Sequence, residues 1–178
     1  MPTKKQFQIQ HFNNTLNLYA SEEKQYTSSW FMDFGKFGSE LFNSEREKKY
    51  SINKKFQFWK WKMVYTIRDR SEDVLELISL NNRKTIYSIE VDQVIYVVKV
   101  HYKKKTSVFK NGDKIAEFDA SILDENQYHT SHLYLLDVND LEMCFLLFSC
   151  LKIGETEQNS KIVLSSQKQL EINEEPWV

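Results

Sequence analysis

NDLEMCFLLFSCLKIG, residues Asn139–Gly154, constrains the architecture of the whole chain. Nearly every residue between its two ends is apolar, so a helix over this range has no polar face and must be buried on all sides. At 1.5 Å per residue the helix spans roughly 20 Å, which is too short to cross a hydrocarbon layer of about 30 Å. Protein must therefore surround it, and we expect Phe145, Leu147, Phe148 and Leu151 to be nearly fully buried.

Both ends of this predicted helix carry residues that are typical of helix boundaries. Asn139 is expected to cap the N-terminus, and Glu142 follows at the spacing of a capping box. Gly154 suits the position just past the last turn, where a left-handed conformation is favoured. Cys144 and Cys150 would lie about 9 Å apart along the helix, which is too far for a disulfide, so we expect two core thiols in a reducing compartment.

The segments before the helix mostly alternate apolar and polar residues, as half-buried strands do. Asn111–Gly112 is the strongest hairpin signal in the chain. The two prolines, Pro2 and Pro176, lie near the termini, so nothing between them interrupts long ladders. Ten or more short strands followed by one buried helix indicate a mainly β fold, either a meander barrel or a closed sandwich around that helix.

The length of 178 residues suits a single domain over residues 1–178. With 41% hydrophobic residues, including 12 Phe and 9 Tyr, the chain can fill a sizeable core. A last strand is expected at 161–165, and residues 167–178 are predicted to be a C-terminal tail. The N-terminal sequence has no signal-peptide pattern and no apolar run of transmembrane length, which favours a cytoplasmic protein, with peripheral membrane association left open.

Residues 56–68, FQFWKWKMVYTIR, are predicted to form one strand. The apolar set shifts from even to odd positions near Phe58, so a bulge there would keep both sets facing inward. Trp59 and Trp61 would then lie in the core, with Lys60 and Lys62 on the solvent face. Interleaved aromatic and basic residues also occur in proteins that bind single-stranded nucleic acid. That alternative is disfavoured, because the two kinds of side chain point to opposite faces and the chain has a net charge of −1.

Three pieces of the chain carry a resemblance to a known superfamily: ELFNSEREKKYSINKKFQFWKWKMVYTIRD, SVFKNGDKIAEFDAS and YLLDVNDLEMCFLLFSCLKIGE. In pattern and order they are similar to the tubby-like superfamily, in the branch of the LURP-one-related proteins and phospholipid scramblases. The resemblance implies a closed antiparallel barrel of about twelve strands around a central hydrophobic helix. The calcium-binding segment of scramblases is not seen, and about two dozen residues follow the helix here, so no family site residue is transferred.

Charge is distributed unevenly along the chain. Residues 1–116 carry 21 Lys and Arg against 13 Asp and Glu, whereas residues 117–178 carry 3 against 12. A solvated mixed surface accounts for this, and so does a basic face that attracts an anionic partner. The candidate binding residues on such a face are Lys54, Lys55, Lys60, Lys62, Lys103, Lys104 and Lys105.

No catalytic or cofactor-binding signature is present in the sequence, and no metal site is expected. His129 and His132 are three residues apart, but on a strand that spacing points them to opposite faces. The sequence favours a non-catalytic binding or scaffolding module at an anionic phospholipid surface. An acidic protein partner is the alternative, and a ligand-holding barrel ranks third because a central helix would fill its lumen.

Overall fold

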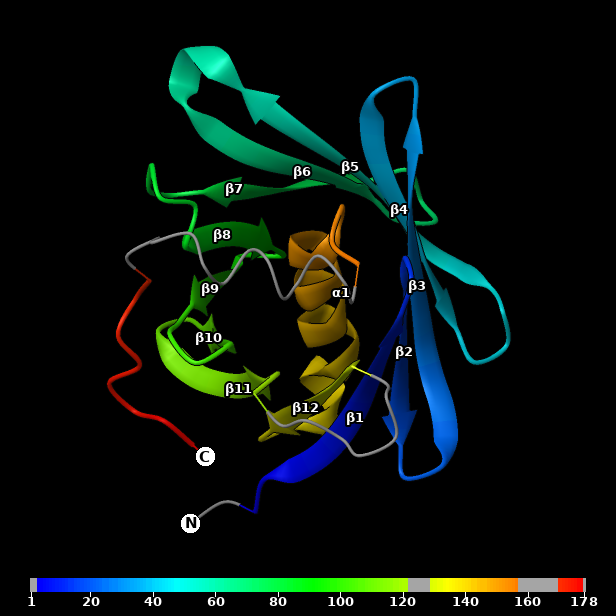
Figure 1. Ribbon diagram of the computed structural model, residues 1–178, viewed down its shortest axis with the longest axis vertical. Coiled ribbons are helices and arrows are strands. Elements are labelled where there is room, and N and C mark those ends of the chain that lie inside the picture. Colours follow the sequence, from blue (N-terminus) through cyan, green and yellow to red (C-terminus); the bar gives the residue numbers. More distant parts are fainter. Residues whose placement is uncertain (1–2, 122–128, 157–169, 178) are drawn as a thin grey trace.

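The computed structural model of the protein describes residues 3–121, 129–156 and 170–177. Figure 1 shows the arrangement of the elements in these ranges. The strands are β1 (Lys5–Phe12), β2 (Thr15–Ala20), β3 (Glu23–Asp33), β4 (Lys36–Asn43), β5 (Lys48–Gln57), β6 (Lys62–Arg68), β7 (Val74–Ser79), β8 (Ile86–Val91), β9 (Val94–Val100), β10 (Lys105–Lys110), β11 (Asp113–Asp119) and β12 (His129–Leu135). The helices are the 3-10 turns η1 (Phe58–Lys60) and η2 (Val138–Asp140) and the α-helix α1 (Leu141–Lys152). The strand predicted at 161–165 lies outside the described residues.

The strands close into one antiparallel barrel, which confirms the predicted architecture of the sheet. Each of the described strands pairs with the next one along the chain, and β1 also pairs with β12. At this seam Ile9 lies opposite Leu18 of β2 on one side and Ser131 of β12 on the other. A closed ring leaves no edge among these strands to pair with another chain.

Alternate strand residues form the buried interior of the barrel, as the period of two in the sequence predicts. They are almost all aliphatic, and Phe118 of β11 adds an aromatic ring. These buried side chains include Ile9, Leu18, Leu41, Ile52, Ile67, Leu77, Ile89, Val98, Val108, Phe118 and Leu133.

The helix α1 packs against this interior. Phe145, Leu147 and Phe148 are buried as predicted, whereas the prediction is wrong for Leu151, which is only partly buried. The ring of Phe148 stacks on that of Phe118 of β11 with centroids 4.2 Å apart, and the ring of Phe145 lies 6.1 Å from that of Tyr26 of β3. Strands that are not neighbours in the ring therefore contact the same helix. No helix in the described ranges is long and apolar enough to cross a bilayer.

The start of α1 differs from the prediction. The chain enters the helix through η2, where Asp137 accepts a hydrogen bond from the backbone N–H of Asn139 at 3.0 Å. Asn139 is therefore not the capping residue. Glu142 does not fold back as in a capping box, because its carboxylate accepts hydrogen bonds from tyrosines of the barrel instead. Gly154 follows the last turn with a φ of 89°, as predicted.

The prediction of one strand over residues 56–68 is wrong. β5 ends at Gln57, η1 and Trp61 turn the chain, and β6 begins at Lys62, which pairs with Gln57 across the hairpin. The change of face in the sequence therefore marks a hairpin tip and not a bulge. As a result Trp59 is 99% exposed and Trp61 is 54% exposed, rather than lying in the core.

The described part of the predicted tail, residues 170–177, packs along the outside of the barrel, and we call it the C-terminal segment. The backbone N–H of Glu171 donates to the carbonyl of Val100 on β9 at 3.2 Å. Further along, the backbone N–H of Trp177 donates to the carboxylate of Glu117 on β11 at 3.2 Å. The segment therefore spans from β9 to β11. The remainder of the predicted tail lies outside the described residues.

Candidate functional site

Two neighbouring hairpins, β3–β4 and β5–β6, project from the same end of the barrel, at the top of Figure 1. Their turns carry large apolar side chains that are mostly exposed. We call these residues, together with the lysines that flank them, the tip surface: Met32, Phe34, Phe58, Trp59, Trp61, Lys36, Lys60 and Lys62. Phe31 is also half exposed, but its ring lies over Gly38, which explains its position.

The β3–β4 turn places Phe34 in an unusual backbone conformation. Phe34 has a φ of 44° and Gly35 a φ of 77°, as in a two-residue hairpin turn in which both residues are left-handed. The β10–β11 turn has the same conformation and carries Asn111 and Gly112, the residues that this turn prefers. A left-handed phenylalanine costs about 1–2 kcal/mol. Since Phe34 is 99% exposed, no packing within the described residues offsets that cost.

The β5–β6 turn is held in shape by an aromatic cluster. The ring of Phe56 contacts Phe58 and Trp61 edge to face, with centroids 4.8 and 5.4 Å away. The ammonium group of Lys84 also lies over the ring of Phe56, 4.1 Å from its centroid. Trp59 makes no ring contact with the described residues. Phe56, Phe58 and Trp61 therefore stabilise the turn, whereas the side chain of Trp59 is exposed to solvent.

Four of the seven lysines predicted as a binding site lie on the β5–β6 hairpin. The side chains of Lys55 and Lys60 are exposed, and that of Lys62 is partly exposed. Lys54 has another role, because its Nζ donates to the carbonyl of Ile153 at 2.7 Å and so ties β5 to the end of α1. Three of these four predicted lysines are therefore accessible to solvent, Lys62 only in part.

The other three predicted lysines lie elsewhere. Lys103 and Lys104 are in the loop between β9 and β10, which Figure 1 shows well apart from the two projecting tips. Lys105 begins β10, and its Nζ lies 3.8 Å from Glu117 and 3.7 Å from Asp119 of β11. The structure therefore does not bring the seven lysines together into one face.

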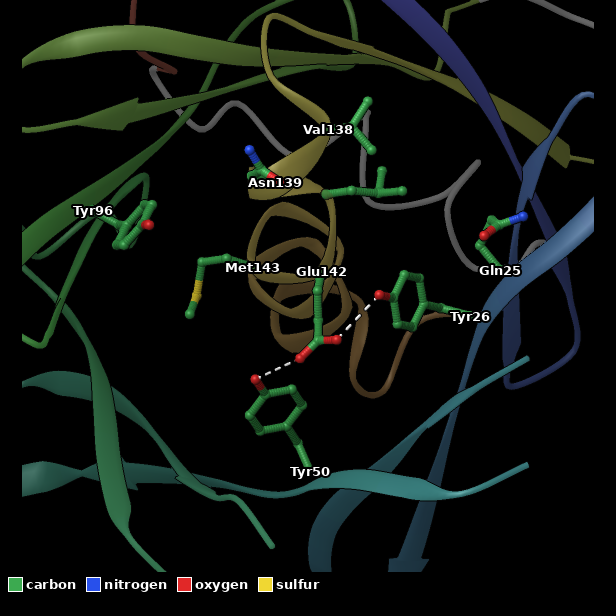
Figure 2. Close-up of a pocket in the computed structure, with 9 residues that line it drawn as sticks. Gln25, Tyr26, Tyr50, Tyr96, Val138, Asn139, Glu142 and Met143 are labelled. Atoms are coloured by element: carbon green, nitrogen blue, oxygen red, sulfur yellow. Dashed lines mark hydrogen bonds between the residues drawn. The ribbon is translucent and has the colours of Figure 1, made fainter. Parts of the chain in front are cut away.

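A cavity of about 550 Å³ opens at the opposite end of the barrel, beside the first turn of α1 (Figure 2). Tyrosines from three strands line it together with residues of η2 and α1. The lining residues are Gln25, Tyr26, Tyr50, Tyr96, Val138, Asn139, Leu141, Glu142 and Met143.

Glu142 projects from α1 into this cavity and is held by the barrel, as Figure 2 shows. Tyr50 donates to Oε1 at 2.8 Å, Tyr26 donates to Oε2 at 3.1 Å, and Nζ of Lys49 lies 3.4 Å from Oε2. Burial, followed by the negative charge of Glu142, raises the pKa of Tyr26 to about 12. Burial and the hydrogen bond to Glu142 also raise the pKa of Tyr50. Both hydroxyls are therefore protonated hydrogen-bond donors at neutral pH.

Asp140 forms a second pairing beside the same cavity. Lys110 of β10 donates to Oδ1 of Asp140 at 2.7 Å, and the hydroxyl of Tyr96 of β9 lies 3.4 Å from the same oxygen. Negative side chains are favourable near a helix N-terminus. Asp140 and Glu142 together fix the start of α1 to β3, β5, β9 and β10. Both carboxylates therefore serve as structural anchors of the helix.

The two cysteines and the two neighbouring histidines lie at separate places in the fold. Cys144 and Cys150 are free and buried, as predicted, and burial raises the pKa of both thiols, so neither is a ready nucleophile. His129 and His132 both lie on β12. Within the described ranges no group of three or more His, Cys, Asp or Glu side chains is placed to hold a metal ion.

Comparisons with protein-family models, with curated proteins and with solved structures found no match. The resemblance to the tubby-like superfamily therefore stays a prediction.

The sequence prediction included part of the tip surface, Lys60 and Lys62, but missed its aromatic residues. One signal was present: Phe34 immediately precedes Gly35 between two alternating segments, which is the spacing of a two-residue turn. For Trp59 and Trp61 no such signal exists, because alternation of aromatic and basic residues is equally typical of a half-buried strand.

Proposed function

We propose that the protein is a non-catalytic binding module of the tubby-like type that associates with anionic membrane surfaces through its tip surface. One observation carries the proposal: Lys36, Lys60 and Lys62 flank exposed aromatic side chains at one end of the barrel. Asp33 is the one acidic residue within the two turns, 33–36 and 58–62. The proposal places the protein in the cytoplasm as a peripheral membrane protein.

The expected binding is weak and reversible. A lysine near an anionic membrane contributes about 1 kcal/mol, and the attraction falls off within a Debye length of about 8–10 Å. The net charge of the chain, −1, provides no overall attraction, so binding depends on the end of the molecule that faces the membrane.

A central position of α1 in the barrel suits a rigid binding module. In our proposal α1 is the central helix of the barrel, supported by its contacts with β3, β5 and β11 and by the burial of Phe145, Leu147 and Phe148. A central helix would fill the lumen. A ligand-holding barrel is therefore the less favoured function.

Cosedimentation with vesicles tests the proposal. Vesicles of phosphatidylcholine, with and without phosphatidylserine, are mixed with the protein at low and at physiological salt. We expect the protein to sediment with the phosphatidylserine vesicles, most strongly at low salt. No sedimentation at low salt would reject the membrane as the partner.

An acidic protein partner is the second candidate, because exposed Trp residues flanked by charge are also typical of protein interfaces. Capture from a native lysate by wild type but not by Trp59→Ser, without vesicle binding, would favour it.

A further inference from the structure

We infer that the two hairpin tips insert into the bilayer, with Phe34 and Trp59 entering the interfacial layer of an anionic phospholipid membrane. The inference rests on the proposed function and adds a mode of binding to it. Charge alone would hold the barrel above the headgroups. Insertion adds an apolar contribution that salt does not screen.

The position of the two side chains supports insertion. Phe34 and Trp59 are each 99% exposed and lie in the turns of two neighbouring hairpins. In Figure 1 both hairpins rise from the top of the barrel, β3–β4 upward and β5–β6 upward and to the left. Met32 near the end of β3 and Phe58 at the start of η1, which are 63% and 71% exposed, lie close to them along the chain. A flat membrane can therefore reach both tips without any change in the barrel.

Packing among the described residues does not account for Phe34 and Trp59. Phe34 takes the left-handed position at which the corresponding β10–β11 turn has Asn111. Trp59 lies beside the cluster of Phe56, Phe58 and Trp61 without joining it. Residues that cost stability or add none within the fold point to a function outside it.

Positive charge lies directly beside the exposed rings. Lys36 follows the Phe34–Gly35 turn directly, and Lys60 and Lys62 alternate with the tryptophans. In this arrangement the lysines would contact phosphate groups while the rings lie at headgroup level, which is where Trp is enriched in membrane proteins. Phospholipid headgroups with a net negative charge are complementary to these three lysines.

A membrane fits the tips better than a protein partner does. Aromatic residues that dominate protein interfaces cluster near the centre of a well-packed patch surrounded by a polar rim. Here the most exposed rings lie at the two projecting turns, each next to a lysine. Rings that project in this way suit a membrane, whose surface they can penetrate.

Tryptophan fluorescence with brominated lipid tests insertion. The full chain is mixed with phosphatidylcholine–phosphatidylserine vesicles whose phosphatidylcholine carries bromine on its acyl chains. We expect emission to be quenched in wild type and the quenching to be largely lost in Trp59→Ser.

The double variant Phe34→Asn/Trp59→Ser should bind the vesicles at least about tenfold more weakly. The matched control Ile95→Ser, which alters a half-exposed apolar residue at the other end of the barrel, should bind like wild type.

The outcomes separate this inference from the proposed function. Vesicle binding without quenching would overturn insertion and leave charge-driven association standing. Quenching that persists with neutral vesicles at high salt would support insertion and overturn the dependence on charge. Absence of binding to every vesicle, with circular dichroism showing a folded protein, would overturn both and favour a protein as occupant of the tip surface.

Discussion

Phe34 occupies a backbone conformation that a phenylalanine side chain does not favour. Its backbone is left-handed, its side chain is exposed, and the residue that this turn normally prefers is present at Asn111 in the same chain. Asparagine tolerates this conformation because its short side chain can hydrogen-bond locally, whereas the Cβ of phenylalanine crowds the following carbonyl.

We therefore predict that Phe34→Asn stabilises the protein. Relief of the left-handed strain should raise the free energy of unfolding by about 1 kcal/mol in chemical denaturation. Phe34→Leu, which keeps a bulky apolar residue and the same strain, should leave stability unchanged. A loss of stability in Phe34→Asn would mean that the ring makes a packing contribution of its own.

A second prediction concerns the carboxylate of Glu142. Tyr50→Phe removes the 2.8 Å hydrogen bond to a charged acceptor and should lower the free energy of unfolding by about 1.5–3 kcal/mol. In the background of Glu142→Ala the same substitution should cost much less, because the acceptor is already gone. Equal costs in the two backgrounds would show that the network does not anchor α1.

At the scale of elements, α1 depends on burial for its place in the fold. Leu147 is fully buried, so Leu147→Asp would place a carboxylate in an apolar environment at a cost of several kcal/mol. Since domains of this kind are stable by about 5–15 kcal/mol, this one change should unfold the protein or nearly so in chemical denaturation. The control Leu147→Met should cost less than about 1.5 kcal/mol. Unchanged stability of Leu147→Asp would contradict the burial of this face.

One buried carboxylate holds the far end of the C-terminal segment. Glu117 of β11 accepts hydrogen bonds from Lys114, from the side-chain amide of Asn173 and from the backbone N–H of Trp177. Burial by itself would raise the pKa of Glu117. The hydrogen bonds outweigh burial and hold this pKa below its ordinary value of 4.5.

This lowered pKa predicts acid lability of the segment. A carboxyl group whose pKa is lower in the folded state contributes stability above its unfolded pKa, and that contribution is lost as the pH falls through the folded pKa. Denaturation of the wild type should therefore show stability falling below about pH 4.5. Glu117→Gln should be less stable at neutral pH and should show a smaller decrease over that range. Identical pH profiles would exclude Glu117 as the group responsible.

The sequence predicted elements better than it predicted their ends and turns. The burial of α1 follows from its composition, since no polar face exists, and the β10–β11 hairpin follows from Asn111–Gly112. The start of α1 was mispredicted because tyrosines distant in sequence compete for Glu142. The β5–β6 tip was mispredicted because alternation does not reveal where a strand stops when the turn residues are themselves aromatic.

At the scale of the whole molecule, the net charge gives no information about where the lysines lie. The chain carries 24 Lys and Arg against 25 Asp and Glu, so long-range attraction to an anionic surface nearly cancels. Several of its lysines are used within the fold: Lys54, Lys105, Lys110 and Lys114 all hold parts of the protein together. In the proposed function the lysines of the tip surface are the ones that contact the membrane.

Charge reversal at two places in the fold distinguishes the contribution of the tip lysines to vesicle binding from that of the net charge. The double variant Lys60→Glu/Lys62→Glu should weaken binding to phosphatidylserine vesicles by at least about 2 kcal/mol, or roughly thirtyfold, because each lysine contributes about 1 kcal/mol near the surface and its reversal adds repulsion. The matched variant Lys103→Glu/Lys104→Glu makes the same change in net charge in the β9–β10 loop, two hairpins round the ring from the β5–β6 tip. It should bind within about threefold of wild type, because charges farther than a Debye length from the membrane are screened. Cosedimentation at physiological salt measures both. Equal losses in the two variants would show that the protein responds to its overall charge, and the tip surface would then have no special part in binding.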